Sequence, residues 1–212
     1  MPSQKIDRRK KVDLWALERS LRARGVRHPA GVDEVGRGPL AGPVVAAAVI
    51  FKAGFRHRGI RDSKQLTPAQ REDLVPEITG AAVAWALGES SPEEIDAVNI
   101  LQATFRAMER ALAALAVAPD YLLVDGAHLP TVLLPGEGVV DGDGRVACIA
   151  AASIIAKVHR DRLMVEHAAR WPAYGFENHK GYGTAEHLAA LAQHGPCPIH
   201  RRTFRGVLPA HS

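Results

Sequence analysis

The sequence predicts an α/β domain with a mixed five-stranded sheet, flanked by helices and followed by a helical C-terminal part. Two observations predict this class. Apolar, β-branched runs at 29–35 and 44–51 are separated by a turn rich in Gly and Pro, which indicates a hairpin. Later apolar runs at 120–125 and 139–140 alternate with helical patterns, as strands of parallel sheets do.

The first half of the chain has clear boundary signals. Residues 13–24 predict a short amphipathic helix that Asp13 can cap and Gly25 can end. The capping box 67–70 (TPAQ) has Pro at the first helical position and opens a helix to about residue 78. A strand over 81–88 follows it.

The second half alternates more regularly. A second capping box at 91–94 (SPEE) opens a short helix, and a longer helix runs through 101–115. After the strands comes an acidic turn at 141–144 (DGDG), then a long helix over 148–169 and a last helix over 184–194. No repeat or low-complexity linker divides this part. We therefore expect one domain over 29–212, preceded by a basic extension with a short helix over 1–28.

Composition excludes several classes of protein. The chain of 212 residues is 47% hydrophobic and 24% charged, as globular domains are. No run approaches the roughly 20 apolar residues that a membrane span needs, and the start lacks a secretory signal. The two cysteines stand far apart, at Cys148 and Cys197, which favours a reducing compartment over a disulfide scaffold. We expect a cytoplasmic monomer with no membrane association.

Positive charge is concentrated at the two ends of the chain. Residues 1–28 contain nine Lys/Arg and three Asp/Glu, and residues 200–212 contain three Arg and no acid. Because the whole chain carries +4, the part between them carries −5. An acidic body with basic ends suits a metal site whose polyanionic partner is gripped from outside. Solvated basic tails would explain the same charges.

Four acids follow apolar, strand-like runs, where ligands of α/β sheets usually bind. They are Asp33, Glu34, Asp125 and Asp143. Gathered carboxylates repel one another unless a cation joins them, and oxygen ligands without His or Cys indicate Mg²⁺ or Mn²⁺. Two such ions can clamp the attacking and leaving oxygens of a phosphodiester. Each acid taken singly is also consistent with a simple turn or helix cap.

Asp33 and Glu34 pose a geometric problem, because neighbours on a regular strand point to opposite faces. Either the strand breaks there, or one of the two reaches the metal differently, for instance through its backbone carbonyl. We expect Asp33 to be the central ligand.

Three loops have the chemistry to bind nucleic acid. The turn Gly36, Arg37 and Gly38 can bring backbone amides close to a ribose 2′-hydroxyl. The loop 62–66 (DSKQL) offers a hydroxyl and the ammonium of Lys64 to a phosphate, and Tyr182 stands between glycines, where it can stack on a sugar or base. The alternative is a plain tight turn for 36–38 and a surface turn for the other two loops.

Two further groups are weaker candidates. His194, Cys197 and His200 suggest zinc, but they lack a second Cys pair and the segment holds two prolines. Asp161 fits ion pairing on a helix surface better than a metal site, for which it stays in reserve.

Several motifs occur together, in one order, and resemble those of bacterial ribonuclease HII. They are 31–40 (GVDEVGRGPL), 62–66 (DSKQL), 124–126 (VDG), 150–158 (AAASIIAKV), 179–182 (HKGY) and 200–204 (HRRTF). The resemblance covers about residues 29–206. It implies a ribonuclease H-like fold and an endonuclease that uses two Mn²⁺ or Mg²⁺ ions. The implied substrates are RNA/DNA hybrids and duplex DNA with embedded single ribonucleotides, cut to 5′-phosphate and 3′-hydroxyl ends.

The same resemblance implies roles for particular residues. The four acids hold the metals and the Gly36, Arg37 and Gly38 turn reads the 2′-hydroxyl, while Tyr182 packs on the next deoxyribose. Lys64 and Ser153 fall at positions that imply phosphate contact. One departure is Asp141, which stands where the family usually has Lys, and it leaves Asp141 as a rival of Asp143 for the fourth ligand. The alternatives are a junction resolvase of the same fold and a non-catalytic nucleic-acid-binding module.

Overall fold

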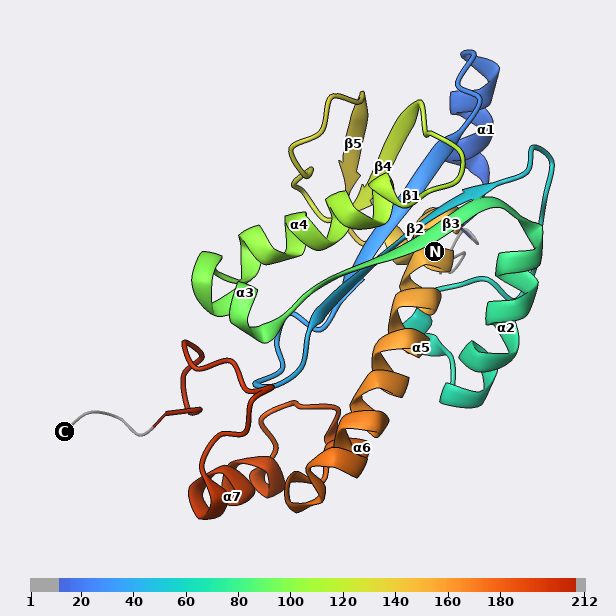
Figure 1. Ribbon diagram of the computed structural model, residues 1–212. Helices are drawn as coiled ribbons and strands as arrows, with labels where there is room; N and C mark the ends of the chain where they lie inside the picture. The colour runs from blue at the N-terminus through green and yellow to red at the C-terminus, as the bar shows by residue number, and fades with distance from the viewer. Residues whose placement is uncertain (1–11, 209–212) are drawn as a thin grey trace, which may run out of the picture.

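The computed structural model describes residues 12–208, whose centre is one five-stranded sheet in the order β3-β2-β1-β4-β5 (Figure 1). Strand β2 pairs antiparallel with β1 and β3, whereas β4 pairs parallel with β1 and β5. The predicted mixed sheet of five strands is confirmed. The strands are β1 (Pro29–Val35), β2 (Val44–Phe51), β3 (Ala82–Ser90), β4 (Tyr121–Asp125) and β5 (Gly136–Val139).

Helices cover both faces of the sheet, because alternate residues of the central strands face opposite cores. One core contains Val45, Ala47 and Val49 of β2, and α1 (Ala16–Ala23), α2 (Pro68–Ala81) and α5 (Ala147–Arg170) pack on it. The other contains Val44, Ala46 and Ala48, under α3 (Pro92–Val98) and α4 (Ile100–Ala113). Figure 1 shows α4 and α5 on opposite sides of the sheet.

A third cluster forms the predicted helical C-terminal part. The end of α5, the 3₁₀ turn η3 (Pro172–Tyr174), α6 (Phe176–His179) and α7 (Ala185–His194) pack around Met164 and Phe176. The helix predicted over 184–194 is confirmed to within one residue, with Thr184 as the cap of α7 and Gly195 at its end. The short helix α6 was not predicted, because one turn carries no periodic signal.

Strand β5 begins three residues before the strand predicted at 139–140 and ends one residue before it does. Its sequence, GEGV, has two glycines, a residue type that is depleted in strands. The packing requires them: a Cβ on Gly136 would lie 2.8 Å from the Leu122 carbonyl oxygen, and one on Gly138 would lie 2.5 Å from that of Gly126. Close contact with β4 and the loop that follows it therefore outweighs strand propensity at this edge.

The described part of the predicted extension packs on the first core. Helix α1 is shorter than the helix predicted over 13–24. Its Leu21 is buried in the first core, and so is Trp15, the residue that precedes the helix. A boundary at residue 28 stays a prediction. Four of the nine basic residues counted in 1–28 stand at 8–11 (RRKK), outside the described residues.

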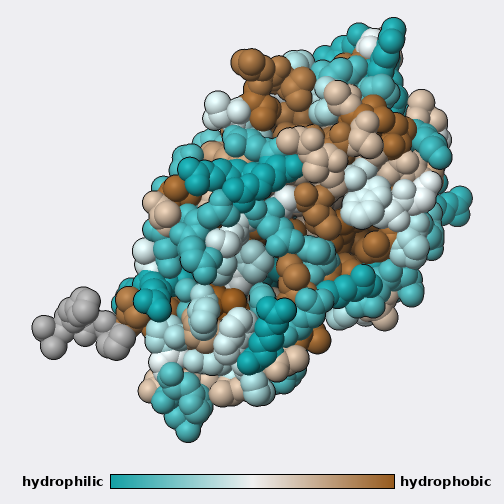
Figure 2. Space-filling view, in the orientation of Figure 1, coloured by the Kyte–Doolittle hydropathy of each residue, from teal (hydrophilic) through white to brown (hydrophobic). Residues whose placement is uncertain are grey.

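Within residues 12–208, no helix is both long and apolar enough to cross a bilayer. Figure 2 shows hydrophilic side chains over much of one face, with smaller hydrophobic areas mainly in its upper half.

Candidate active site

A pocket of about 410 Å³ opens at the carboxyl ends of β1 and β4, and all four predicted acids line it. Asp33 lies on β1, and Asp125 is the last residue of β4. Asp143 comes from the 3₁₀ turn η2 (Gly142–Gly144). The structure therefore brings together acids that are up to 110 positions apart in the chain. The other lining residues are Val35, Ser63, Lys64, Arg71, Ser153, Lys157 and Tyr182.

Strand β1 does not break at the two adjacent acids, so that explanation of their geometry is wrong. Asp33 and Glu34 stay paired with β2, opposite Ala47 and Ala46. However, the pairing of β1 with β4 ends at Val32. The protruding end of β1 lets Asp33 face Ser153 of α5 and Glu34 lie near α4, while both remain beside Asp125.

The electrostatics of the pocket favour a bound cation. Burial raises the pKa of Asp33 well above its usual range, and the charges of Glu34 and Asp125 raise it further. Burial also raises the pKa of Glu34 and, with help from Asp143, that of Asp125. A hydrogen bond of 2.7 Å from the Glu34 amide to Asp33 Oδ1 offsets only part of this cost. Carboxylates in such a pocket gain stability when a divalent cation neutralises them.

Two side-chain cations now contact these acids. Lys64 Nζ lies 2.9 Å from Asp143 Oδ2, and Arg37 Nη1 lies 3.2 Å from Glu34 Oε1. Among residues 12–208, no three His, Cys, Asp or Glu side chains are arranged to hold one metal ion in these rotamers. The oxygen-only donor set fits a hard divalent cation. Lys64 and Arg37 each contact one oxygen of these acids, which leaves Asp143 Oδ1 and Glu34 Oε2 free of ion pairs in the described residues.

Asp143 and its rival Asp141 differ sharply in exposure. Asp143 is only 5% exposed and lines the pocket, whereas Asp141 is exposed and precedes η2 with φ of 55°. Asp141 is absent from the pocket lining. This placement supports Asp143 as the fourth ligand.

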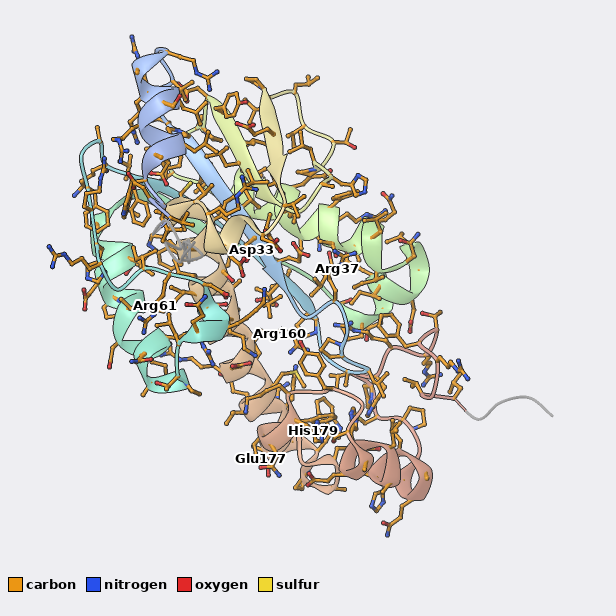
Figure 3. All side chains as sticks on the ribbon, turned by 180° about the vertical axis from the view of Figure 1, so that it is seen from behind. Asp33, Arg37, Arg61, Arg160, Glu177 and His179 are labelled. Atoms are coloured by element: carbon orange, nitrogen blue, oxygen red, sulfur yellow. The ribbon has the colours of Figure 1, made fainter. Side chains whose placement is uncertain are left out.

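The expected substrate-binding residues lie around the same pocket. Tyr182 is 44% exposed, and a Cβ placed on Gly38 would lie 3.6 Å from its Cε1. Figure 3 shows Arg37 on the turn that follows β1. By contrast, Ser153 is buried, with its Oγ 3.0 Å from Ser63 Oγ. Its hydroxyl also lowers the pKa of Asp33, so Ser153 supports the acid site from within.

Several basic residues of the site were not predicted. Arg71 and Lys157 line the pocket, and Arg160 and Arg201 are fully buried beside the turn at 36–43. The expectation that Arg201 belongs to an exposed basic end is therefore wrong, although Arg202 and Arg205 are exposed. A helical count from Ser153 through Ala156 would have placed Arg160 on the buried side of α5.

The two weaker candidates lie elsewhere. Asp161 pairs with Lys157 at 2.8 Å, as expected of helix-surface ion pairing, and lines a separate groove between α2 and α5. His194 is exposed, whereas Cys197 and His200 are buried and contact each other at 3.1 Å. The described residues contain no three-ligand group, which leaves the zinc interpretation unsupported.

Comparison with known proteins agrees with this geometry. A family model described as Ribonuclease HII matches residues 30–207. The Ribonuclease HII of Geobacter metallireducens is 54% identical over 194 residues, which cover 92% of this chain and 91% of the relative.

Solved structures show the ribonuclease H-like fold that was predicted. The ribonuclease H2 from Pyrococcus horikoshii OT3 superposes with a TM-score of 0.71 at 29% identity, covering 85% of this chain and 95% of that one. A structure of Bst-RNase HIII in complex with Mn²⁺ has a TM-score of 0.57 at 20% identity, covering 80% and 70%, and supports the fold alone. Enzymes of this family use divalent metal ions. The chain belongs to the ribonuclease HII family and is an endoribonuclease that acts on RNA/DNA hybrids.

Proposed function

We propose that the acidic pocket hydrolyses a phosphodiester bond of the RNA strand in hybrids and at single ribonucleotides embedded in duplex DNA. The products carry 5′-phosphate and 3′-hydroxyl ends. One observation carries this proposal: four acids share a pocket of about 410 Å³ with Tyr182, and Gly38 faces that tyrosine. A phosphate and its neighbouring sugar can therefore be held side by side.

Asp33, Glu34, Asp125 and Asp143 would hold two Mg²⁺ or Mn²⁺ ions. Asp33 is the central ligand in this proposal, because it is the most buried of the four and feels the charges of two others. When bound, such ions lower the pKa of a water molecule and stabilise the leaving oxygen.

The chain's own residues would orient the substrate. Backbone groups of Gly36, Arg37 and Gly38 contact the 2′-hydroxyl, and Tyr182 packs on the next deoxyribose. Lys64 has a 78% exposed side chain and is placed to meet a phosphate. Ser153 lines the pocket and would contact a phosphate, while its hydroxyl also hydrogen-bonds Ser63 and supports Asp33. The buried, free Cys148 and Cys197 support a reducing, cytoplasmic setting, in which we expect a monomer.

A cleavage assay tests the proposal. Two end-labelled duplexes, identical except for one ribonucleotide, are incubated with Mg²⁺, Mn²⁺ or a chelator. We expect a single cut at the ribonucleotide, dependent on the divalent ion, and no cut in the all-DNA duplex. Equal cutting of both duplexes would favour a junction resolvase, and binding without cleavage would contradict the catalytic assignment.

A further inference from the structure

Arg160 of α5 and Arg201 near the C-terminus are both 0% exposed. Within residues 12–208, neither forms an ion pair with a carboxylate. Burial lowers the pKa of Arg160 to about 10 and that of Arg201 to about 9, the latter with a contribution from the neighbouring charge of Arg160. Two adjacent buried cations are costly, so their hydrogen bonds have to offset a large loss of hydration.

Backbone carbonyls take the place of the missing carboxylates, and nearly all belong to the turn at 36–43. Arg160 donates to the carbonyls of Ala41 and Pro43, each at 3.0 Å. Arg201 donates to those of Gly36, Arg37 and Gly42, at 2.5 to 3.0 Å. Figure 3 shows Arg160 between α5 and this turn.

The turn is shaped around the guanidinium groups. Gly36 has φ of +93°, and a Cβ there would lie 2.2 Å from Arg160 Nε. Gly42 has φ of +84°, and its Cβ would meet Met164 Sδ at 2.4 Å. A larger residue would displace the Arg160 guanidinium at Gly36 or Met164 at Gly42, and the positive φ would strain the backbone at both positions.

The same arginines connect the turn to the loop that carries Tyr182. Arg160 Nη1 donates to the Lys180 carbonyl at 3.0 Å, and the Leu40 amide donates to the Gly181 carbonyl at 2.8 Å. The Arg201 amide in turn donates to the Leu40 carbonyl at 2.9 Å. The turn and the tyrosine loop therefore form one hydrogen-bonded unit.

We infer that Arg160 and Arg201 are positioning residues that hold the turn at 36–43 in register with Tyr182, so that the ribose is bound in a reactive position. This inference rests on the proposed function of the turn. Neither arginine is part of the lining of the acidic pocket. Their effect is to keep the backbone groups of the turn preorganised, which matters because small displacements cost large factors in rate.

Conservative variants test the inference. Arg201→Lys and Arg160→Lys keep a positive charge but cannot bridge several carbonyls. The matched control is Arg22→Lys, because Arg22 also donates to two carbonyls, of Arg27 and Phe51, but is not part of the pocket lining. Two quantities are measured: kcat and KM on the duplex with one ribonucleotide, and hydrogen exchange of the Leu40 and Gly42 amides.

We expect each variant at 160 or 201 to lose about tenfold or more in kcat/KM. Exchange of the two amides should accelerate by about tenfold or more, because the turn opens locally. Arg22→Lys should change kcat/KM and the exchange rates of the two amides by less than about twofold. A well-folded Arg201→Lys protein with unchanged exchange, or with faster exchange but unchanged kcat/KM, would overturn the inference.

The wild-type protein supplies a measurement that no folding failure can remove. The Leu40 and Gly42 amides should exchange about 100-fold or more slowly than the Phe55 amide, which is hydrogen-bonded in a surface loop without a buried arginine. Equal exchange would overturn the inference even if both variants unfold. If the wild type does not cleave at ribonucleotides, the proposed function fails, and the exchange data still report whether the arginines hold the turn.

Discussion

Gly38 lies beside the ring of Tyr182, and the fold leaves room for a small side chain between them. A Cβ at Gly38 would make one ordinary contact, 3.6 Å from Tyr182 Cε1, and no positive φ demands glycine there. We therefore predict that Gly38→Ala leaves stability within about 0.5 kcal/mol of wild type. The added methyl occupies space next to the proposed ribose site, so kcat/KM on a single-ribonucleotide duplex should fall about tenfold, or about 1.4 kcal/mol.

Gly36→Ala is the matched control, since its methyl would clash with Arg160 and should lower stability itself. Thermal melts and steady-state kinetics separate the two variants. Normal activity of Gly38→Ala would mean that the space beside Tyr182 is not used by substrate.

Lys64 holds Asp143 at 2.9 Å, and this hydrogen bond raises the pKa of the lysine. Lys64→Gln should therefore have opposite effects on metal and substrate. Without the competing ammonium, the Mg²⁺ concentration for half-maximal activity should fall by about twofold or more. Loss of a phosphate contact should raise KM about fivefold.

The exposed Lys52, in the loop after β2, provides a charge-matched control as Lys52→Gln. Metal titrations at saturating substrate and substrate titrations at saturating metal distinguish the two effects. If the half-maximal Mg²⁺ concentration and KM changed as little in Lys64→Gln as in Lys52→Gln, Lys64 would neither compete with the metal nor contact a phosphate.

Asp33 is 4% exposed, and burial raises its pKa well above the usual range. The ionised group therefore costs stability at neutral pH when no cation is bound, and that cost increases as pH rises. Asp33→Asn should lower kcat by about a thousandfold. It should also stabilise the metal-free protein by about 1 kcal/mol, since it removes the buried charge and keeps an acceptor for the Glu34 amide.

Melting curves with and without Mg²⁺ provide the measurement. Wild type should melt higher with Mg²⁺, whereas Asp33→Asn should respond weakly, because ligands stabilise only the state that binds them. An Asn variant that is both active and metal-stabilised would remove Asp33 from the centre of the site.

Local patterns predicted the elements and acids whose signals lie within a few residues. The capping boxes at Thr67 and Ser91 are present with both of their hydrogen bonds. Asp33 and Asp125 were visible because each ends an apolar run that forms a strand. Patterns of this kind depend only on neighbours in the chain.

The missed features depend on contacts between distant segments. Gly136 is in a strand because Leu122 leaves no room for a side chain. Arg201 reads as a surface charge in the sequence, yet its partners are carbonyls about 160 positions away, and backbone carbonyls have no sequence signature. For the same reason, the sequence could not show that Lys64 pairs with Asp143.

Glu18 of α1 caps the long helix α5 from outside. Helix α5 has no side-chain cap of its own, and the Cys148 amide in its first turn donates to Glu18 Oε1 at 2.8 Å. Glu18 is 5% exposed, so its loss would leave an amide without a partner. We predict that Glu18→Ala lowers the free energy of unfolding by about 1–3 kcal/mol.

Urea denaturation at neutral pH measures the change, with Glu18→Gln as the variant that retains an acceptor oxygen. The Gln variant should lose less than the Ala variant, and folded samples of both should cleave at the wild-type rate. Equal stability of all three proteins would show that the contact between α1 and α5 does not depend on this cap.

The buried rings of His200 and His187 link the Cys197 amide to the Tyr182 carbonyl through a chain of hydrogen bonds. The Cys197 amide donates to His200 Nδ1, so His200 Nε2 must donate to His187 Nε2, 3.0 Å away. His187 Nδ1 then donates to the Tyr182 carbonyl at 2.9 Å. Only neutral rings satisfy this order, because each ring accepts one bond and donates the other.

Protonation should therefore destabilise the C-terminal part. Burial lowers the pKa of His187 and, together with the charge of His187, lowers that of His200 to about 4. His179 stacks on His187 at 4.5 Å and lowers the pKa of both rings further. Since an unfolded histidine titrates near 6.5, the stability from the neutral rings is complete above that pH and is lost as pH falls toward 4.

We predict that the melting temperature of wild type falls more steeply between pH 6.5 and pH 4.5 than that of His187→Asn. At pH 7.5 the variant should have the lower melting temperature, because it loses hydrogen bonds. The difference in melting temperature should narrow in acid, where the wild-type rings become protonated and the same bonds break. His128→Asn, at an exposed position, should follow wild type throughout.

A difference in melting temperature between wild type and His187→Asn that stayed constant with pH would mean that these rings are not held neutral. Because the network ends on the Tyr182 carbonyl, narrowing of this difference should coincide with a rise in KM for the ribonucleotide duplex.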